Sequence, residues 1–157
     1  PARQAAQQAQ ACGKGSDGFF CGAALQLADG RVVTGKNSPL LHAASGLILN
    51  AVKVLAGMPE PIHLLPTNVT RSLCHFKTDV LRGKVTSLDL EETLIALSIS
   101  SITNPAAETA IEQLKLLRGC DVHLTHIPSP GDATALRKLG INATSEPEFA
   151  SKYLFVS

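Results

Sequence analysis

The chain has 157 residues, a length that suits one globular domain with a core and is short for two. Its 14 Lys and Arg residues nearly balance its 13 Asp and Glu residues, so the net charge of +1 gives no reason to expect nucleic acid or an anionic membrane as a partner. No apolar run approaches the roughly 20 residues that a membrane span requires.

Residues 1–18 are predicted to be a flexible amino-terminal segment or linker, in which the first 16 or so residues are either the end of a helix from something upstream or disordered. Residues 1–11 are rich in Ala and Gln, which favour helix but form a poor apolar stripe, and a Gly-rich stretch follows. The segment lacks the pattern of a secretory signal. The four cysteines are scattered, which favours reduced thiols, and we expect a cytoplasmic protein.

Residues 19–34 have the pattern of a β-hairpin. The apolar run 19–27 is typical of a strand that is buried on much of both faces. Asp29-Gly30 is a strong turn signal, and the Val-rich residues 31–34 then return along the chain. The sequence therefore predicts two antiparallel strands joined by a tight turn.

The clearest helix is predicted over residues 40–56. Apolar residues recur there at helical spacing, Ser38 can cap the start with Pro39 at the first helical position, and Gly57 ends the helix.

Two weaker elements follow this helix. Residues 62–65 have the pattern of a short strand between two prolines, and Thr67 can cap a modest helix to about residue 77. The nearby basic residues Lys77, Arg82 and Lys84 are interpreted as a solvated surface.

Helices and strands alternate in the second half of the chain. Ser87 or Asp89 can cap one helix, Asn104 followed by Pro105 begins the next, and Ser129-Pro-Gly-Asp132 begins a short third helix. We predict helices over 89–102, 105–118 and 129–139, and strands over 120–127 and 141–145. The pattern indicates a single domain over residues 19–157, with an α/β fold: a three-layer α/β/α sandwich whose mixed sheet opens with an antiparallel hairpin.

Two stretches resemble the halves of a zinc deaminase site. Residues 22–37 form the expected hairpin and are followed by His42-Ala43-Ala44, and Pro105-Ala-Ala-Glu-Thr109 occurs further on. In a cytidine-deaminase-type site, the first helix carries His/Cys-Ala-Glu and the second starts with Pro-Cys-x-x-Cys. The similarity implies a cytidine-deaminase-like fold in which only His42 remains as a zinc ligand. It also implies no zinc chemistry, because Ala106, Thr109 and Ala44 replace the other groups.

A second resemblance covers nearly the whole chain from residue 19. It is to the carboxy-terminal domain of a mostly bacterial family with a domain of unknown function, number 1846. Members of that family are much longer and carry a Gly-rich, P-loop-like segment upstream, so we expect this chain to be part of a longer architecture. The matching segments begin with Ala28-Asp-Gly-Arg-Val-Val-Thr-Gly-Lys36 and Leu49-Asn-Ala-Val-Lys-Val-Leu-Ala-Gly57, and continue through Leu94-Ile-Ala-Leu-Ser98, Thr103-Asn-Pro105, Ala110-Ile-Glu-Gln-Leu114, Lys115-Leu-Leu-Arg-Gly-Cys120 and Arg137-Lys-Leu-Gly140.

Four residues are predicted to line a ligand pocket between two converging helix starts: Asn37, His42, Asn104 and Thr109. Each also has a plainer interpretation. His42 can be a partly buried residue bonded to backbone, Asn104 a helix cap, and Asn37 part of a polar turn. No catalytic residue, metal ligand or cofactor is predicted. The pairs Cys74-His75 and His123/His126 are poorly placed for a nucleophile or a metal.

Three functions fit this sequence. The first is a non-catalytic module that binds a small molecule or has a regulatory or oligomerisation role. The alternative is part of a nucleotide- or phosphate-handling enzyme whose catalytic region lies in a missing amino-terminal part. The third is a dimerisation domain, in which the helices over 40–56 and 89–102 present an apolar face to another copy. A homo-oligomer is expected in the first case as well.

Overall fold

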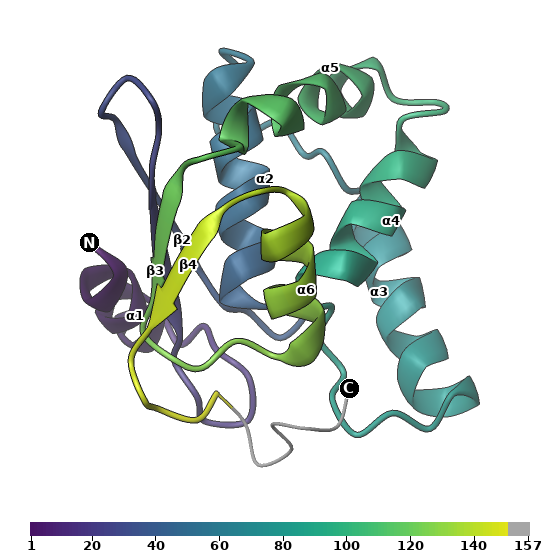
Figure 1. Ribbon diagram of the computed structural model, residues 1–157. Helices are drawn as coiled ribbons and strands as arrows, with labels where there is room; N and C mark the ends of the chain where they lie inside the picture. The colour runs from purple at the N-terminus through teal and green to yellow at the C-terminus, as the bar shows by residue number, and fades with distance from the viewer. Residues whose placement is uncertain (151–157) are drawn as a thin grey trace.

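The computed structural model describes residues 1–150, which form an α/β domain built on one four-stranded sheet (Figure 1). The elements run in the order α1 (Ala2–Ala11), β1 (Gly22–Gln26), β2 (Val32–Lys36), α2 (Ala43–Leu55), α3 (Thr67–His75), the π-helix η1 (Phe76–Val80), α4 (Leu90–Ser100), α5 (Pro105–Gln113), the 3-10 helix η2 (Leu114–Leu117), β3 (Asp121–Leu124), α6 (Pro130–Lys138) and β4 (Asn142–Ser145).

The sheet is mixed and has the strand order β2-β1-β3-β4. The predicted hairpin is confirmed: β1 and β2 are antiparallel, with Ala23 opposite Gly35 and Leu25 opposite Val33. Strand β3 lies antiparallel on the other side of β1, and β4 pairs with β3 in parallel. The sheet therefore opens with an antiparallel hairpin and ends with a parallel pair, which the α6 crossover connects.

Helices cover both faces of the sheet, and two glycines identify which helix lies on which face. A side chain at Gly35 would overlap the backbone of Leu47 in α2, whereas one at Gly22 would overlap the Ala2 carbonyl of α1. Gly35 shares a face with its cross-strand partner Ala23, and Gly22 points the other way because neighbours along a strand alternate. Helices α1 and α2 thus lie on opposite faces, as Figure 1 also shows.

The α2 face of the sheet carries the main core. Leu25 on β1, Val122 on β3 and Leu47 on α2 are each almost fully buried there. Helix α6 packs beside β4 and α4, and α5 lies against α2 and α4. Helices α3 and α4 stand outermost in Figure 1, so α4 has core residues on one side and solvent on the other.

The amino-terminal segment contains a helix that packs on the sheet. Residues 2–11 form α1, whose small residues Ala2, Ala5 and Ala9 are buried against β1 and β2. Arg3 Nε also donates to Glu146 Oε1 at 2.6 Å. The composition did not predict this contact, because a stripe of alanines is only weakly apolar. The small alanine side chains nevertheless let the backbone of α1 approach a glycine of the sheet closely.

The predicted strand over residues 62–65 is wrong. Leu64 and Leu65 are buried in the core, but their backbone is a bend between Pro61 and Pro66 and joins no sheet. A short apolar run shows that residues are buried and does not distinguish a strand from a buried turn.

Most predicted helix starts are confirmed. Asp89, Asn104 and Ser129 cap α4, α5 and α6 through their side chains. The proposed caps Ser38 and Thr67 are wrong. Ser38 Oγ accepts from Leu40 and Leu41 in a turn before α2, and Thr67 lies inside α3.

Two further findings concern the cysteines and membranes. All four cysteines lie in the described part of the chain and are free thiols. Within residues 1–150, no helix combines the length and the apolar character needed to cross a lipid bilayer.

Candidate ligand-binding site

A cavity of about 80 Å³ opens where the starts of α2, α4 and α6 meet at one end of the sheet. Its volume is enough for a few water molecules or a small polar group. The polar side chains around it come from distant parts of the chain, and the floor is the beginning of β1. Lining residues include Cys21, Asn37, His42, Lys77, Asp89 and Asp132.

The start of α2 is the least satisfied part of this cavity. His42 occupies the N-cap position, but no side chain caps the helix. The first three N–H groups of an α-helix have no acceptor within the helix. Ala43 and Ala44, which carry two of these groups, are buried and line the cavity. The positive end of the α2 dipole therefore faces the cavity.

The His42 side chain bonds to α6 instead of capping its own helix. His42 Nδ1 lies 2.7 Å from Asp132 Oδ2, and both side chains are largely buried. Burial lowers the pKa of the imidazole, but the hydrogen bond and the charge of Asp132, with the charge of Asp89, outweigh it. The net effect is a pKa above the ordinary value. With Nδ1 taken by Asp132, the other ring nitrogen, Nε2, is left available for a ligand.

Asp132 also joins α6 to α4. Its Oδ1 accepts from the Leu90 N–H of α4 at 2.8 Å, while its own N–H donates to the α6 cap Ser129. Asp132 is buried, with 4% of its surface exposed. One carboxylate thus bridges the starts of three helices and fixes the orientation of the His42 ring.

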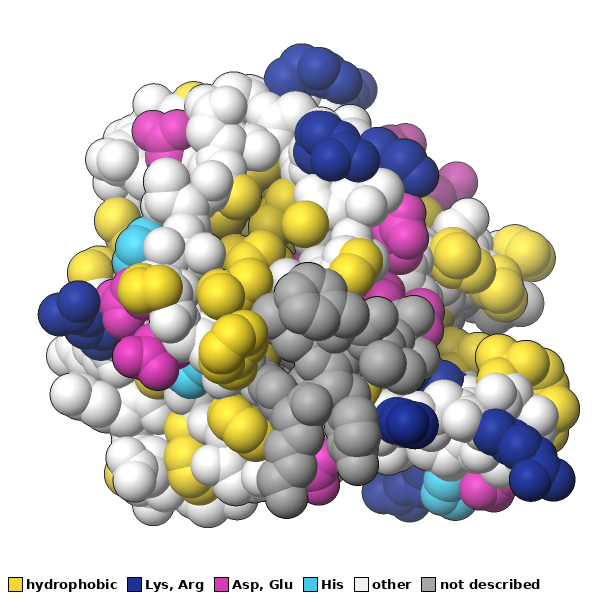
Figure 2. Space-filling model, turned by 60° about the horizontal axis from the view of Figure 1, so that its bottom comes forward, with side chains coloured by type: hydrophobic (Ala, Val, Ile, Leu, Met, Phe, Trp, Pro, Cys, Tyr) yellow, Lys and Arg dark blue, Asp and Glu magenta, His cyan; other side chains and the backbone are white. Residues whose placement is uncertain are grey.

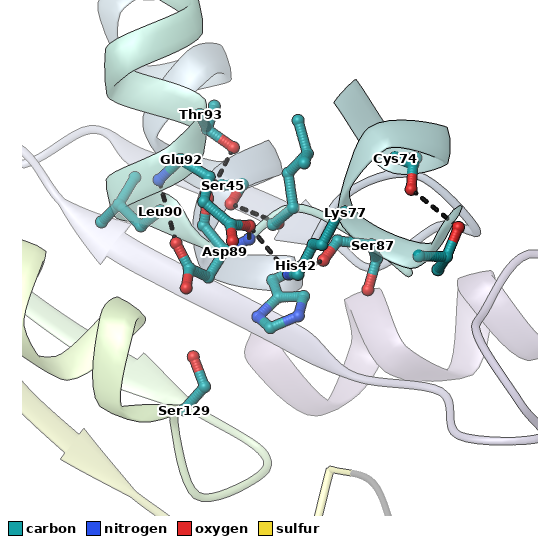
Figure 3. A network of polar contacts seen from close by, with 12 residues as sticks. His42, Ser45, Cys74, Lys77, Ser87, Asp89, Leu90, Glu92, Thr93 and Ser129 are labelled. Carbon is teal, nitrogen blue, oxygen red and sulfur yellow. Dashed lines mark hydrogen bonds and ion pairs between the residues drawn. The ribbon is translucent and has the colours of Figure 1, made fainter. Parts of the chain in front are cut away.

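The start of α4 is capped by side chains. Asp89 Oδ1 accepts from Glu92 N–H, and Glu92 Oε2 accepts from Asp89 N–H, which forms a reciprocal capping box. Glu92 Oε2 also pairs with Lys77 Nζ at 2.9 Å, and Lys77 donates to the Ser87 carbonyl. Figure 3 shows His42, Lys77, Asp89 and Glu92 gathered around this helix start.

The predicted surface role of Lys77 is therefore wrong. Only 7% of this residue is exposed, because η1 turns the side chain inward to the start of α4. A buried ammonium needs paired acceptors, and Glu92 and the Ser87 carbonyl supply them. Lys77 is thus part of the cavity wall.

Cys21 lines the cavity but is not an activated nucleophile. Burial and the charge of Asp132 raise the pKa of its thiol to about 12, so the thiolate is not formed near neutral pH. His126 also lines the cavity, and burial lowers the pKa of its imidazole. Its Nδ1 lies 2.7 Å from Thr125 Oγ1.

Two of the four predicted pocket residues, Asn37 and His42, line this cavity. Asn37 has its polar atoms engaged, since Oδ1 accepts from Cys21 N–H and Nδ2 donates to the Phe19 carbonyl. It therefore holds the ends of the hairpin together, as the plainer interpretation predicted.

Of the other two predicted residues, Asn104 directly precedes α5 and Thr109 lies within it. Asn104 caps that helix, and Thr109 Oγ1 donates to the Pro105 carbonyl. The segments before α2 and α4 run side by side, since His42 N–H donates to Leu88. From this shared position, α4 extends for 11 residues, about 16 Å of helix, before the chain reaches the start of α5. The structure thus does not bring the α2 and α5 starts together. A ligand contact of Asn104 or Thr109 stays a prediction.

Sequence reasoning missed Asp132, Asp89, Lys77 and Cys21 as parts of the site. The two aspartates had a visible signal, because Asp89 is the N-cap of α4 and Asp132 belongs to the first turn of α6, where an acidic residue faces the positive end of the dipole. Nothing in the sequence indicates that these helix starts meet those of α2 and η1.

The family of this chain follows from comparison with known sequences. A family profile described as "Domain of unknown function DUF1846, C-terminal" matches residues 1–155. The chain belongs to this family. Among its DUF1846 relatives, the chain is 45% identical over 132 residues to a UPF0371 protein of Clostridium tetani (strain Massachusetts / E88), covering 84% of this chain and 26% of that protein. A UPF0371 protein of Clostridioides difficile (strain 630) is 41% identical over 134 residues, which is 85% of this chain and 27% of the relative.

The chain thus spans about a quarter of the length of these DUF1846 relatives. The α/β domain described above corresponds to the carboxy-terminal part that the profile names.

Proposed function

We propose that this DUF1846 domain is a non-catalytic module that binds a small molecule at the start of α2, and that its fold is cytidine-deaminase-like without the zinc site. The observation that carries the proposal is the uncapped start of α2 in a lined cavity, beside a histidine that Asp132 holds in place.

The hydrogen-bonding groups indicate what the ligand must offer. The N–H groups of Ala43 and Ala44 are donors, and the raised pKa of His42 favours the imidazolium, whose Nε2–H is a third. These groups call for an acceptor oxygen, such as that of a carboxylate, a phosphate or a polarised carbonyl. Asp89, which also lines the cavity, can accept from a donor on the same molecule. A small compound with both kinds of group fits best.

The resemblance of residues 42–44 to one half of the deaminase motif favours a binding role over a hydrolytic one, and the other half, at the start of α5, lies apart from it. His42 lies at the end of the hairpin-to-helix connection, where the resemblance places a zinc ligand. The acid/base position is occupied by the apolar Ala44. Within residues 1–150, no group of three or more His, Cys, Asp or Glu side chains is arranged to hold a metal ion.

A second candidate is a role in a nucleotide- or phosphate-handling enzyme. The relatives are about four times longer than the aligned region, so most of their chain lies outside this domain. The phosphate of a nucleotide held by that larger part would suit the donors at the start of α2.

A ligand screen tests the proposal. We expect thermal-shift hits among small carboxylates or phosphates, and binding by isothermal titration. His42→Gln should weaken such a hit by roughly 10- to 100-fold, the usual worth of one hydrogen bond to a charged group. His75→Gln is the matched control, because His75 is exposed at the end of α3 and lies outside the cavity.

The two candidates give different outcomes in that screen. Binding of simple organic acids favours the small-molecule module, and binding that needs a nucleotide favours the enzyme part. Hits that bind H42Q and the wild type equally would contradict both.

A further inference from the structure

One oxygen of the Asp89 carboxylate has no hydrogen-bond partner. Asp89 Oδ1 accepts from the Glu92 N–H at 2.9 Å, and within residues 1–150 no donor bonds to Oδ2. Asp89 is only 5% exposed and lines the cavity. The backbone of α6 closes one side of the carboxylate, since a side chain at Gly131 would overlap Oδ2. In the described residues, every fully sealed oxygen of a buried side chain has a partner, so Oδ2 opens onto the cavity.

The charge of Asp89 has no ion-pair partner in the part of the chain that the structure describes. Lys77 pairs with Glu92 at 2.9 Å, His42 pairs with Asp132 at 2.7 Å, and Asp89 belongs to neither pair. Burial raises the pKa of Asp89 above its ordinary value and outweighs the hydrogen bond from Glu92 N–H, which lowers it. A cation bound to Oδ2 would therefore stabilise a carboxylate that the fold leaves under-compensated.

An ammonium group satisfies Oδ2 more completely than other donors do. A hydroxyl or an amide supplies a hydrogen bond without a charge, whereas an ammonium supplies both. A metal ion needs several ligands, and among residues 1–150 no three His, Cys, Asp or Glu side chains are arranged to hold one. The surroundings of Oδ2 thus favour an amine.

The free donors of α2 lie close to this oxygen. Leu41 and Leu88 form a parallel bridge, so the residues that follow them, His42 and Asp89, are also neighbours. Adjacent strands are about 4.8 Å apart, and α2 and α4 therefore begin about that far from each other. The cavity of about 80 Å³ thus holds free donors and a free carboxylate oxygen together. A ligand that reaches both carries its acceptor oxygen and its ammonium only a few bonds apart, as an amino acid does.

The surface of the domain does not favour a ligand of one charge. Figure 2 shows Lys and Arg side chains interspersed with Asp and Glu side chains, and the net charge of the chain is +1. Such a surface concentrates neither anions nor cations. A ligand with one positive and one negative group suits it.

We propose that the cavity binds a small α-amino acid as its zwitterion, an inference that rests on the proposed function. The ligand carboxylate accepts from the N–H groups of Ala43 and Ala44 and from His42 Nε2, and the ligand ammonium donates to Asp89 Oδ2. The cavity volume limits the side chain of the ligand to the smallest ones, as in glycine and alanine.

An NMR titration of the whole 157-residue chain, labelled with nitrogen-15, tests this pairing. Glycine and alanine are compared with acetate and propionate, which lack only the amino group. We expect the wild type to bind each amino acid at least roughly 10-fold more tightly than its counterpart, the worth of one hydrogen bond between charged groups, with shifts at the Ala43 and Ala44 amides.

Two variants locate the ammonium. Asp89→Asn keeps an acceptor for Glu92 N–H but carries no charge, so the preference for the amino acid should fall to about 1-fold. Glu91→Gln is the matched control, because it removes the same charge from the same helix turn. Glu91 pairs with Lys138 and does not line the cavity, so E91Q should keep the preference.

Equal affinity of the wild type for an amino acid and its counterpart would overturn the inference, yet the proposed function would stand, because the α2 donors would still hold a carboxylate. A preference that persists in folded D89N would also overturn it, since the ammonium would then lie elsewhere. Absence of shifts with all four compounds would overturn it as well, and the wider ligand screen then decides the proposed function separately. Far-UV circular dichroism checks the folding of D89N, and the preference of the wild type is decisive without it.

Discussion

The starts of α2 and α4 lie side by side at the same end of the domain but are satisfied differently. The start of α4 has a reciprocal capping box, a buried lysine and a carboxylate from α6. The start of α2 has no side-chain cap, and its N-cap residue bonds away from the helix. The α2 donors are thus left without a side-chain acceptor, and the proposed ligand site rests on this contrast.

The largest effect is expected at Asp132, because it is shared by both starts. Asp132→Ala leaves the buried Leu90 N–H without its acceptor and His42 without its partner. We expect a loss of about 2–4 kcal/mol in the free energy of unfolding, measured by urea denaturation. Asp132→Asn, which retains a carbonyl oxygen for Leu90, should lose less. Equal losses in the two variants would show that only the charge matters.

A smaller effect is expected for the α4 cap alone. Asp89→Ala removes one half of the capping box and should lower the free energy of unfolding by about 1–2 kcal/mol. Asp89→Asn keeps an acceptor for Glu92 N–H and serves as the control. If D89A and the wild type have the same free energy of unfolding, the capping box does not stabilise α4. The difference in capping between the two helix starts would then have no effect on stability.

The smallest effect concerns the protonation of His42. Its pKa in the folded protein is raised above the ordinary value of 6.5. The resulting stabilisation is fully present below the pKa of the unfolded chain and is lost as the pH rises through the folded pKa. The difference in unfolding free energy between wild type and H42Q should therefore shrink from about pH 5.5 upward to alkaline pH.

Proton NMR checks the same point directly. The His42 ring should titrate with a midpoint above 6.5, whereas burial should bring the midpoint of His126 below it. A His42 midpoint below 6.5 would mean that burial outweighs Asp132. The imidazole would then be neutral, and Nε2 would accept rather than donate.

The local signals in the sequence predicted much of the fold. Asp29-Gly30 marked the hairpin turn, and Asn104-Pro105 and Ser129-Pro130 marked helix starts, because each pattern acts through its immediate neighbours. The sequence did not predict the features that depend on contacts between distant segments. The burial of α1 depends on Gly22 of β1, and the bend at residues 62–65 is held by its place in the core.

The candidate site was predicted only in part for the same reason. His42 was identified because its surroundings resemble a known motif. Its partner Asp132 could not be paired with it, since no periodicity links residues on α2 and α6. Thr109 was placed beside His42 by analogy, whereas the length of α4 separates the two helix starts.

The bond between His42 and Asp132 has a consequence for the order in which the domain folds. It joins residues 90 positions apart, and the bond from Leu90 to Asp132 spans 42. Contacts between such remote positions form only after much of the chain is ordered. A molecule that recognises the oriented imidazole would therefore bind the finished domain and not earlier species, and its concentration would raise the melting temperature by mass action.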